Sequence, residues 1–148
     1  VYTPVEVVDF IIRSVNDLLK DEFDVTLGTE GVHIIDPFTG TGTFVTRLLQ
    51  SGLIPLDRLP HKYTHEIHAN EIVLLAYYIA AINIEAVYHG LVGGKYQPFE
   101  GICLTDTFQL YEKGDLISNL LVNNSTRRKR QKALDIRVIV GNPPYSVG

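Results

Sequence analysis

Several residue types are absent or scarce in this 148-residue sequence. It contains no Met and no Trp, and its single cysteine is Cys103. One cysteine excludes an internal disulfide framework and favours a reducing compartment, so we expect a cytoplasmic protein. Because the sequence begins with Val and has no initiator methionine, we interpret it as an internal segment of a longer polypeptide.

Long hydrophobic runs are absent as well. The longest, Ile72 to Ile82, has 11 residues, whereas a membrane span needs about 20. We therefore interpret this run as a buried helix and expect no membrane partner. The charged, amphipathic N-terminal segment also lacks the apolar centre of a signal peptide.

The net charge of −4 conceals an uneven distribution along the chain. Residues 127–148 carry 6 Lys and Arg against 1 acid, whereas residues 1–126 carry 7 against 16. The basic stretch opens with Arg127, Arg128, Lys129 and Arg130. It is either a solvated helix face or a surface that contacts nucleic-acid phosphates.

Apolar periodicity and turn residues predict alternating helices and strands. At the N-terminus, Thr3 is expected as the helix N-cap, Pro4 as the first helical residue, and Glu6 as its capping-box partner. Further helices are expected from residue 44 and at 72–89, and residues 112–133 are expected to be helical in part, with a loop at 123–130. Strands are expected at 31–36, 64–71, from 102 to about 106, and at 135–140, and a loop is expected at 51–63. This alternation predicts an α/β fold: a Rossmann-like, doubly wound, mainly parallel sheet, truncated after the fourth strand.

The unusual polar residues stand where the expected strands end. Asp36 follows the first strand, Glu71 the second and Asp106 the third, and "NPPY" (residues 142–145) follows the fourth. Ligands of parallel sheets bind at the carboxyl ends of the strands. We therefore expect all four strand ends to form one site.

The glycine loop "DPFTGTGTF" does not fit a phosphate ligand. It lacks the Walker lysine, and Val45 stands where a dinucleotide fingerprint has its third glycine. Asp36 would repel phosphate but suits a cationic ligand, which Gly40 and Gly42 would admit close to the backbone. Glu71 could accept hydrogen bonds from ribose hydroxyls and Asp106 one from an adenine amino group, although single acids at such positions are often helix caps. Together they indicate S-adenosylmethionine.

The order of these motifs resembles the S-adenosylmethionine-dependent adenine-N6 DNA methyltransferases. "YTP" matches motif X, "DPFTGTGTF" motif I, "NEI" motif II, "LTDTF" motif III and "NPPY" motif IV. The details "YTP" and "HANEI" look most like the methylase part of large single-chain restriction–modification enzymes with a helicase-like translocase. The resemblance implies that residues 1–148 are the N-terminal part of a methyltransferase domain. The rest of that domain and the target-recognition domain are absent, so the isolated segment should be inactive.

The resemblance also implies roles for individual residues around the cofactor. Tyr2 and Thr3 would meet the methionine carboxylate, Glu71 the ribose, and Asp106 the adenine amino group. The methionine and sulfonium would be lined by Asp36, Phe38, Gly40 and Gly42, and the adenine ring would lie against Ile72 and Phe108. The gap between Gly42 and Glu71 is longer than is usual in this family, which leaves motif II less certain than motif I.

The "NPPY" loop suits an amino group as the methyl acceptor. The Asn142 side-chain oxygen and the Pro143 carbonyl could each accept one N–H of adenine N6, which frees the nitrogen lone pair for attack. Pro143 and Pro144 keep backbone donors out of the pocket, and Tyr145 would stack on a flipped base. The implied partners are DNA and the rest of the parent polypeptide, with no metal.

Other functions remain open from the sequence. The same loop occurs in enzymes that methylate guanine N2 in RNA or glutamine amides in proteins. The chain could instead be a catalytically silent S-adenosylmethionine-binding module or a nucleotide-binding regulatory domain.

Overall fold

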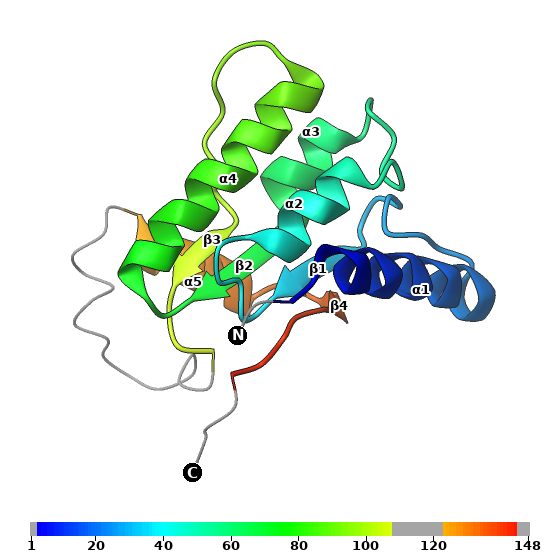
Figure 1. The fold of residues 1–148 in the computed structure, drawn as a ribbon, viewed down its shortest axis with the longest axis horizontal. Helices are drawn as coiled ribbons and strands as arrows, with labels where there is room; N and C mark the ends of the chain where they lie inside the picture. The colour runs from blue at the N-terminus through cyan, green and yellow to red at the C-terminus, as the bar shows by residue number, and fades with distance from the viewer. Residues whose placement is uncertain (1–2, 108–122, 145–148) are drawn as a thin grey trace.

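The computed structural model of the chain describes residues 3–107 and 123–144. Helices alternate with strands along the described chain (Figure 1). The elements are α1 (Val5–Phe23), β1 (His33–Asp36), α2 (Thr43–Gln50), α3 (Leu59–His61), the π-helical turn η1 (Lys62–Glu66), β2 (Ile67–Glu71), α4 (Leu74–Val92), β3 (Ile102–Leu104), α5 (Asn124–Lys132) and β4 (Ile136–Ile139).

The four strands form one parallel sheet in the order β3-β2-β1-β4. In the register, Ile34 of β1 is paired with Ile67 of β2 on one side and with Val138 of β4 on the other. The fold is therefore the predicted Rossmann-like α/β arrangement. Because all strands run the same way, their carboxyl ends lie along one edge of the sheet.

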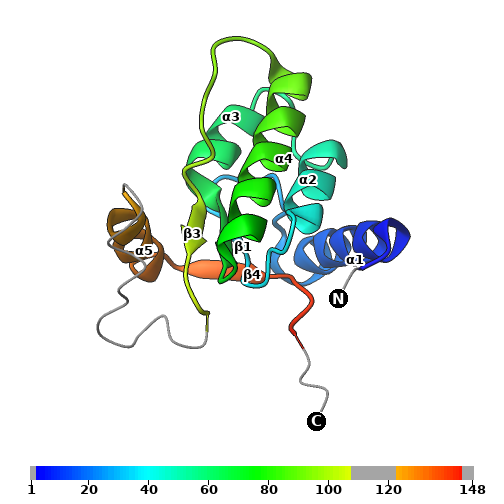
Figure 2. The ribbon, with the colours of Figure 1, turned by 60° about the vertical axis from the view of Figure 1, so that its left-hand side comes forward.

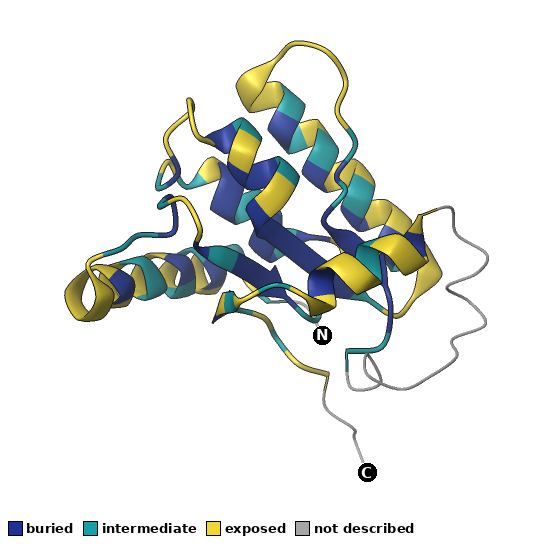
Figure 3. Cartoon of the chain, turned by 180° about the vertical axis from the view of Figure 1, so that it is seen from behind, coloured by how far each residue is buried: buried dark blue, intermediate teal, exposed yellow. Residues whose placement is uncertain are grey.

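The core lies between one face of the sheet and helices α1, α2 and α4. The apolar face of α1 contributes Val8 and Ile12, both buried, because its apolar residues recur at helical spacing. α5 covers β3 on the opposite face of the sheet, where the Gln131 side-chain amide approaches Cys103 Sγ. Figure 3 shows the buried strands behind the largely exposed α5.

Three local expectations differ from the structure. Helix α1 begins at Val5 with Pro4 as its N-cap and without a side-chain cap, so the expected capping box of Thr3 and Glu6 is wrong. The loop expected at 123–130 is mostly α5, and the loop expected at 51–63 contains α3 and the start of η1. The second strand begins at Ile67 because residues 64–66 belong to η1.

Helix α4 is far more exposed than its apolar sequence led us to expect. The buried residues Tyr77, Ala80, Ile84 and Tyr88 form a single stripe along the helix. On the other side, the exposed side chains include Leu75, at 70% exposure. By length and composition alone, α4 could cross a membrane, but one such helix is weak evidence for a membrane span. In this fold α4 packs against α2 and against strands β2 and β3, and Figure 2 shows α4 beside α2.

The approach of β3 to β2 depends on Gly101, directly before β3. A Cβ atom at this position would lie 2.1 Å from the Ile67 carbonyl oxygen and 2.9 Å from the Phe99 ring. Gly101→Ala is therefore expected to lower the free energy of unfolding by about 3 kcal/mol, the upper part of the usual range for overpacking. Urea unfolding followed by circular dichroism measures this loss.

Gly90 provides a matched control for that substitution. It lies in α4, and a Cβ atom there would have no heavy atom within 4 Å. Gly90→Ala should raise the free energy of unfolding by up to about 1 kcal/mol, since alanine favours the helix. If Gly101→Ala unfolds at the wild-type urea concentration, the close contact between β3 and β2 is contradicted.

Candidate functional site

A cavity of about 500 Å³ lies where the four strands end. Each strand contributes to its wall, so the predicted convergence of the strand ends is present in the structure. The lining residues are Pro37, Phe38 and Gly40 after β1, Asn70 to Val73 and Ala76 around the end of β2, Thr105 to Thr107 after β3, and Asn142 and Pro144 after β4. The volume suits a ligand of nucleoside size or somewhat larger.

The loop after β1 is held against its neighbours by hydrogen bonds. Gly40 N donates to Glu71 Oε2 at 2.7 Å, and Thr39 N donates to the Asn70 carbonyl oxygen at 3.0 Å. From the other side, Thr107 Oγ1 donates to the Pro37 carbonyl oxygen at 2.6 Å. The glycine loop is thus fixed to the ends of both β2 and β3, which makes the cavity wall preformed.

Glu71 also holds the start of α4. Its Oε1 accepts hydrogen bonds from Ile72 N at 2.9 Å and Val73 N at 2.8 Å. Glu71 therefore lies in the cavity wall and fixes the two residues before α4, but it is not the helix cap, because α4 has Val73 as its N-cap and no side-chain cap. Oε1 already accepts two hydrogen bonds and Oε2 accepts one, so Oε2 can accept one more from a ligand hydroxyl.

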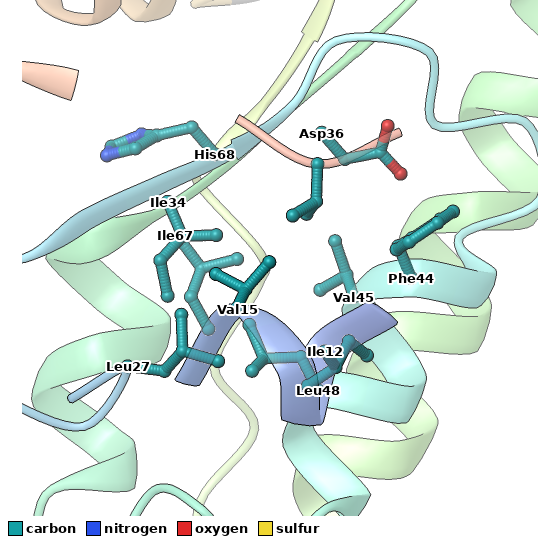
Figure 4. A pocket seen from close by; sticks show the side chains of 11 residues that line it. Ile12, Val15, Leu27, Ile34, Asp36, Phe44, Val45, Leu48, Ile67 and His68 are labelled. Carbon is teal, nitrogen blue, oxygen red and sulfur yellow. The ribbon is translucent and has the colours of Figure 1, made fainter. Parts of the chain in front are cut away.

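Asp36 is not among the residues that line the cavity. Its side chain is buried beside an apolar pocket of about 10 Å³, lined by residues such as Val15, Phe44 and Val45 (Figure 4). Burial raises the pKa of Asp36 to about 7, a hydrogen bond from Phe38 N lowers it, and the nearby Glu71 carboxylate raises it further. Within the described part of the chain, Asp36 Oδ2 has no hydrogen-bond partner.

Asp36 also contacts the loop after β4. A Cβ atom on Gly141 would lie 2.7 Å from Asp36 Oδ1 and 3.3 Å from Pro37 Cδ. Glycine therefore lets the first residue of "GNPP" pass the Asp36 carboxylate without displacing it. This contact sets the position of the next residue, Asn142, at the cavity.

Asn142 is half-buried and faces the N-terminal segment as well as the cavity. Its Nδ2 donates a hydrogen bond to Thr3 Oγ1 at 3.0 Å. The two residues are 139 positions apart, and Figures 1 and 2 show the start of the chain beside the segment that follows β4. Thr3 thus contacts a cavity residue.

The structure brings together most of the predicted site residues, but not all of them. The cavity is lined by Phe38, Gly40, Glu71, Ile72, Asp106, Asn142 and Pro144. Pro143 is exposed beside it. Gly42 instead packs on α4, where its φ of 91° and the approach of Ile84 favour glycine. Tyr2, Phe108 and Tyr145 lie outside the described residues.

Sequence reasoning missed three polar residues in the cavity wall, Asn70, Thr105 and Thr107. Asn70 is fully buried, and within residues 3–107 and 123–144 its Oδ1 has no hydrogen-bond partner. In the sequence, Asn70 could have been identified as a site residue because it directly precedes Glu71 at the end of a strand. The described residues contain no group of three His, Cys, Asp or Glu side chains that could hold a metal ion.

The basic stretch forms α5, on the face of the sheet opposite α4. Arg127 pairs with Glu100 at 3.2 Å and donates to the Tyr77 hydroxyl at 3.0 Å, so it has a structural role. Arg130 donates to the Glu100 carbonyl oxygen at 2.8 Å. Lys129 is exposed. Two arginines of the stretch, Arg127 and Arg130, therefore bind other parts of the fold.

The parallel sheet with helices on both faces and a cavity at its strand ends defines the chain as a Rossmann-like α/β unit. Over 99% of its length it is 51% identical to the Type ISP restriction–modification enzyme LlaGI, solved as a nuclease-deletion mutant with a DNA substrate mimic, with a TM-score of 0.90. It is equally identical, over 99% of its length, to the ATP-dependent Type ISP restriction–modification enzyme LlaBIII bound to DNA, with a TM-score of 0.88. A third similar structure is the DrdV–DNA complex, at 45% identity over 98% of this chain and a TM-score of 0.90.

This chain covers a small part of each of those structures: 13% of the LlaGI chain, 10% of the LlaBIII chain and 14% of the DrdV chain. No protein-family model matches the sequence, and no curated protein matches it either. The similarity therefore relates this chain to one segment of restriction–modification enzymes.

Proposed function

We propose that this chain is part of a restriction–modification enzyme. In this proposal it binds S-adenosylmethionine at the strand-end cavity and supports methyl transfer to adenine N6 in DNA. The observation that carries the proposal is the shared cavity wall. Asn142 and Pro144 stand in the same wall as Glu71 and Asp106, so an amino group and a nucleoside would meet in one space. The similarity to restriction–modification enzymes solved with DNA supports DNA as the partner.

The cavity residues fit S-adenosylmethionine by their chemistry. Glu71 and Asp106 are acceptors for a ribose hydroxyl and an adenine amino group, Ile72 is an apolar surface for the ring, and Phe38 is one for the methionine part. Asp36 lies beneath the loop with an oxygen that lacks a partner among the described residues, which suits a nearby cation. When bound, the cofactor would supply an electrophilic methyl group.

The role of this chain's own residues is to bind and polarise the acceptor. The exocyclic nitrogen of adenine is a weak nucleophile because its lone pair is delocalised into the ring. The Asn142 side-chain oxygen and the Pro143 carbonyl would accept its two N–H bonds and make the lone pair available. Such fixed acceptors act by position and electrostatics, without a strong base.

Two measurements on the full-length protein that carries this chain test the proposal. Equilibrium dialysis should show binding of S-adenosylmethionine, and transfer of labelled methyl groups to unmethylated DNA should yield N6-methyladenine. Binding without transfer would instead identify a silent cofactor-binding module. Failure to bind S-adenosylmethionine at all would overturn the proposal.

The basic helix α5 gives a separate prediction about DNA binding. Replacing Arg128 and Lys129 together by Gln should flatten the slope of log affinity against log salt by about two, because each phosphate contact contributes about 0.9. Fluorescence anisotropy with labelled duplex DNA at several salt concentrations measures this slope.

The matched control replaces Arg58 and Lys95, two exposed basic residues outside α5, by Gln. This pair removes the same charge and should leave the slope unchanged. If both double variants behave alike, α5 is a solvated helix face and not a DNA contact.

A further inference from the structure

The hydrogen bond between Asn142 and Thr3 holds the Asn142 amide at the edge of the cavity and, as the structure orients that amide, leaves its acceptor end available to a ligand. A side-chain amide has a donor end, Nδ2, and an acceptor end, Oδ1, which exchange places when the amide turns over. In the structure, Nδ2 is directed to Thr3 Oγ1 at 3.0 Å. The acceptor oxygen is thereby left for the cavity that Asn142 lines.

Thr3 can serve this purpose because its hydroxyl is not used by the helix that follows. Pro4 is the N-cap of α1, and the helix has no side-chain cap. Proline also restricts Thr3 itself to an extended conformation. The Thr3 hydroxyl therefore lies just before the N-terminus of α1, where it contacts Asn142 in the loop after β4.

The N-terminal segment is well anchored for such a role. Arg47 of α2 binds both carboxylate oxygens of Asp9, at 2.8 Å and 2.6 Å. Val8, one residue before Asp9, is fully buried in the core. Since the first turn of α1 is fixed to α2 and to the core, Thr3 provides a fixed partner for Asn142.

Thr3 does not itself line the cavity, as far as the described residues define it. Its contact with the site passes through Asn142. The sequence-based expectation that Thr3 meets the methionine carboxylate of the cofactor stays a prediction.

We propose that Thr3 is a positioning residue that holds the Asn142 amide with its oxygen toward the acceptor amino group. This inference rests on the proposed methyl transfer and deepens it. Loss of the hydroxyl should slow transfer about ten- to a hundredfold, the usual cost of removing a group that orients a functional side chain. The affinity for S-adenosylmethionine should stay within about twofold of the wild type.

The test compares Thr3→Val, which keeps the side-chain shape, with Thr3→Ser, which keeps the hydroxyl. Single-turnover methyl transfer to DNA and equilibrium dialysis with S-adenosylmethionine are measured on the full-length protein. Thr3→Val should be slow in transfer, and Thr3→Ser should restore most of the rate. Thr64→Val is the matched control, because Thr64 Oγ1 donates to the Pro60 carbonyl oxygen outside the cavity wall.

Each outcome separates this inference from the proposed function. A wild-type rate in Thr3→Val, with active wild-type protein, overturns the positioning role and leaves the methyltransferase proposal intact. Weaker cofactor binding in Thr3→Val, with an unchanged rate at saturating cofactor, assigns Thr3 to the cofactor and also overturns it. A wild-type protein that transfers no methyl group overturns both.

Discussion

Replacing Asn142 by alanine should lower the rate of methyl transfer by about a hundredfold or more, with cofactor affinity nearly unchanged. The expected size follows from the loss of one preorganised hydrogen-bonding group in an enclosed site. Asn142 lies on the acceptor side of the cavity, after β4, whereas Glu71 and Asp106 lie after β2 and β3. The substitution therefore affects the acceptor and not the donor of the methyl group.

Single-turnover transfer to unmethylated DNA and equilibrium dialysis with S-adenosylmethionine measure the two quantities for Asn142→Ala. Asn16→Ala is a matched control, because Asn16 Oδ1 accepts a hydrogen bond from Leu27 N and lies outside the cavity wall. That variant should keep the wild-type rate. Near-normal turnover in Asn142→Ala would remove Asn142 from the mechanism.

The affinity for S-adenosylmethionine should fall about tenfold for each pH unit below 7. Burial raises the pKa of Asp36 to about 7, so this carboxyl is neutral below that pH and ionised above it. A cationic ligand above Asp36 favours the ionised form. At lower pH, binding must therefore remove a proton from Asp36, whereas above pH 7 the affinity should level off.

Dialysis between pH 5.5 and 8.5 measures this dependence. Asp36→Asn should bind more weakly at pH 8, and its affinity should be nearly constant over the same range. A wild-type affinity that does not change with pH would contradict the proposed link between Asp36 and the ligand.

The free energy of unfolding of the cofactor-free protein should fall as the pH rises, whereas the affinity for the cofactor should increase. The pKa of Asp36 is raised from 3.8 when unfolded to about 7 when folded. Its contribution to stability is thus complete below pH 4 and is lost as the pH rises to 7. Asp36→Asn should therefore melt at a higher temperature than the wild type at pH 8, which also shows that the variant folds.

The strands and their convergence were predictable because both depend on local sequence. Short β-branched runs such as residues 32–35, each followed by an acid or a turn, mark parallel strands and their ends. The rule that ligands bind at those ends then places Glu71, Asp106 and Asn142 in one site without further information.

Some helix was expected within residues 112–133, but the bounds of α5 were not predictable, because tertiary contacts hold its first residue. Its first residue, Asn124, is buried, and its side chain bonds both the N–H and the carbonyl oxygen of Leu104 at 2.9 Å and 3.0 Å. This amide occupies the free edge of β3 as a neighbouring strand would. A polar sequence with little apolar periodicity gave no sign of that contact.

The role of Thr3 was misjudged for a related reason. The pattern of Thr3, Pro4 and Glu6 satisfies a local capping rule, and the rule takes no account of a partner 139 residues away. The exposure of α4 likewise depends on which elements cover it. Composition could not specify that Leu75 would be exposed while Tyr77 is buried.

The central position of β1 has a consequence for biosynthesis. Its neighbour β4 begins at Ile136, a hundred residues after β1 ends at Asp36. At about 5–20 residues per second, a ribosome needs roughly 5–20 s to make that interval. During this time β1 can pair with β2 on one side, while its other edge has no partner from β4. The loop that carries Asn142 can therefore reach its place only after β1, β2 and β3 have been made, so the cavity wall from Asn142 and Pro144 is completed after the walls from those three strands.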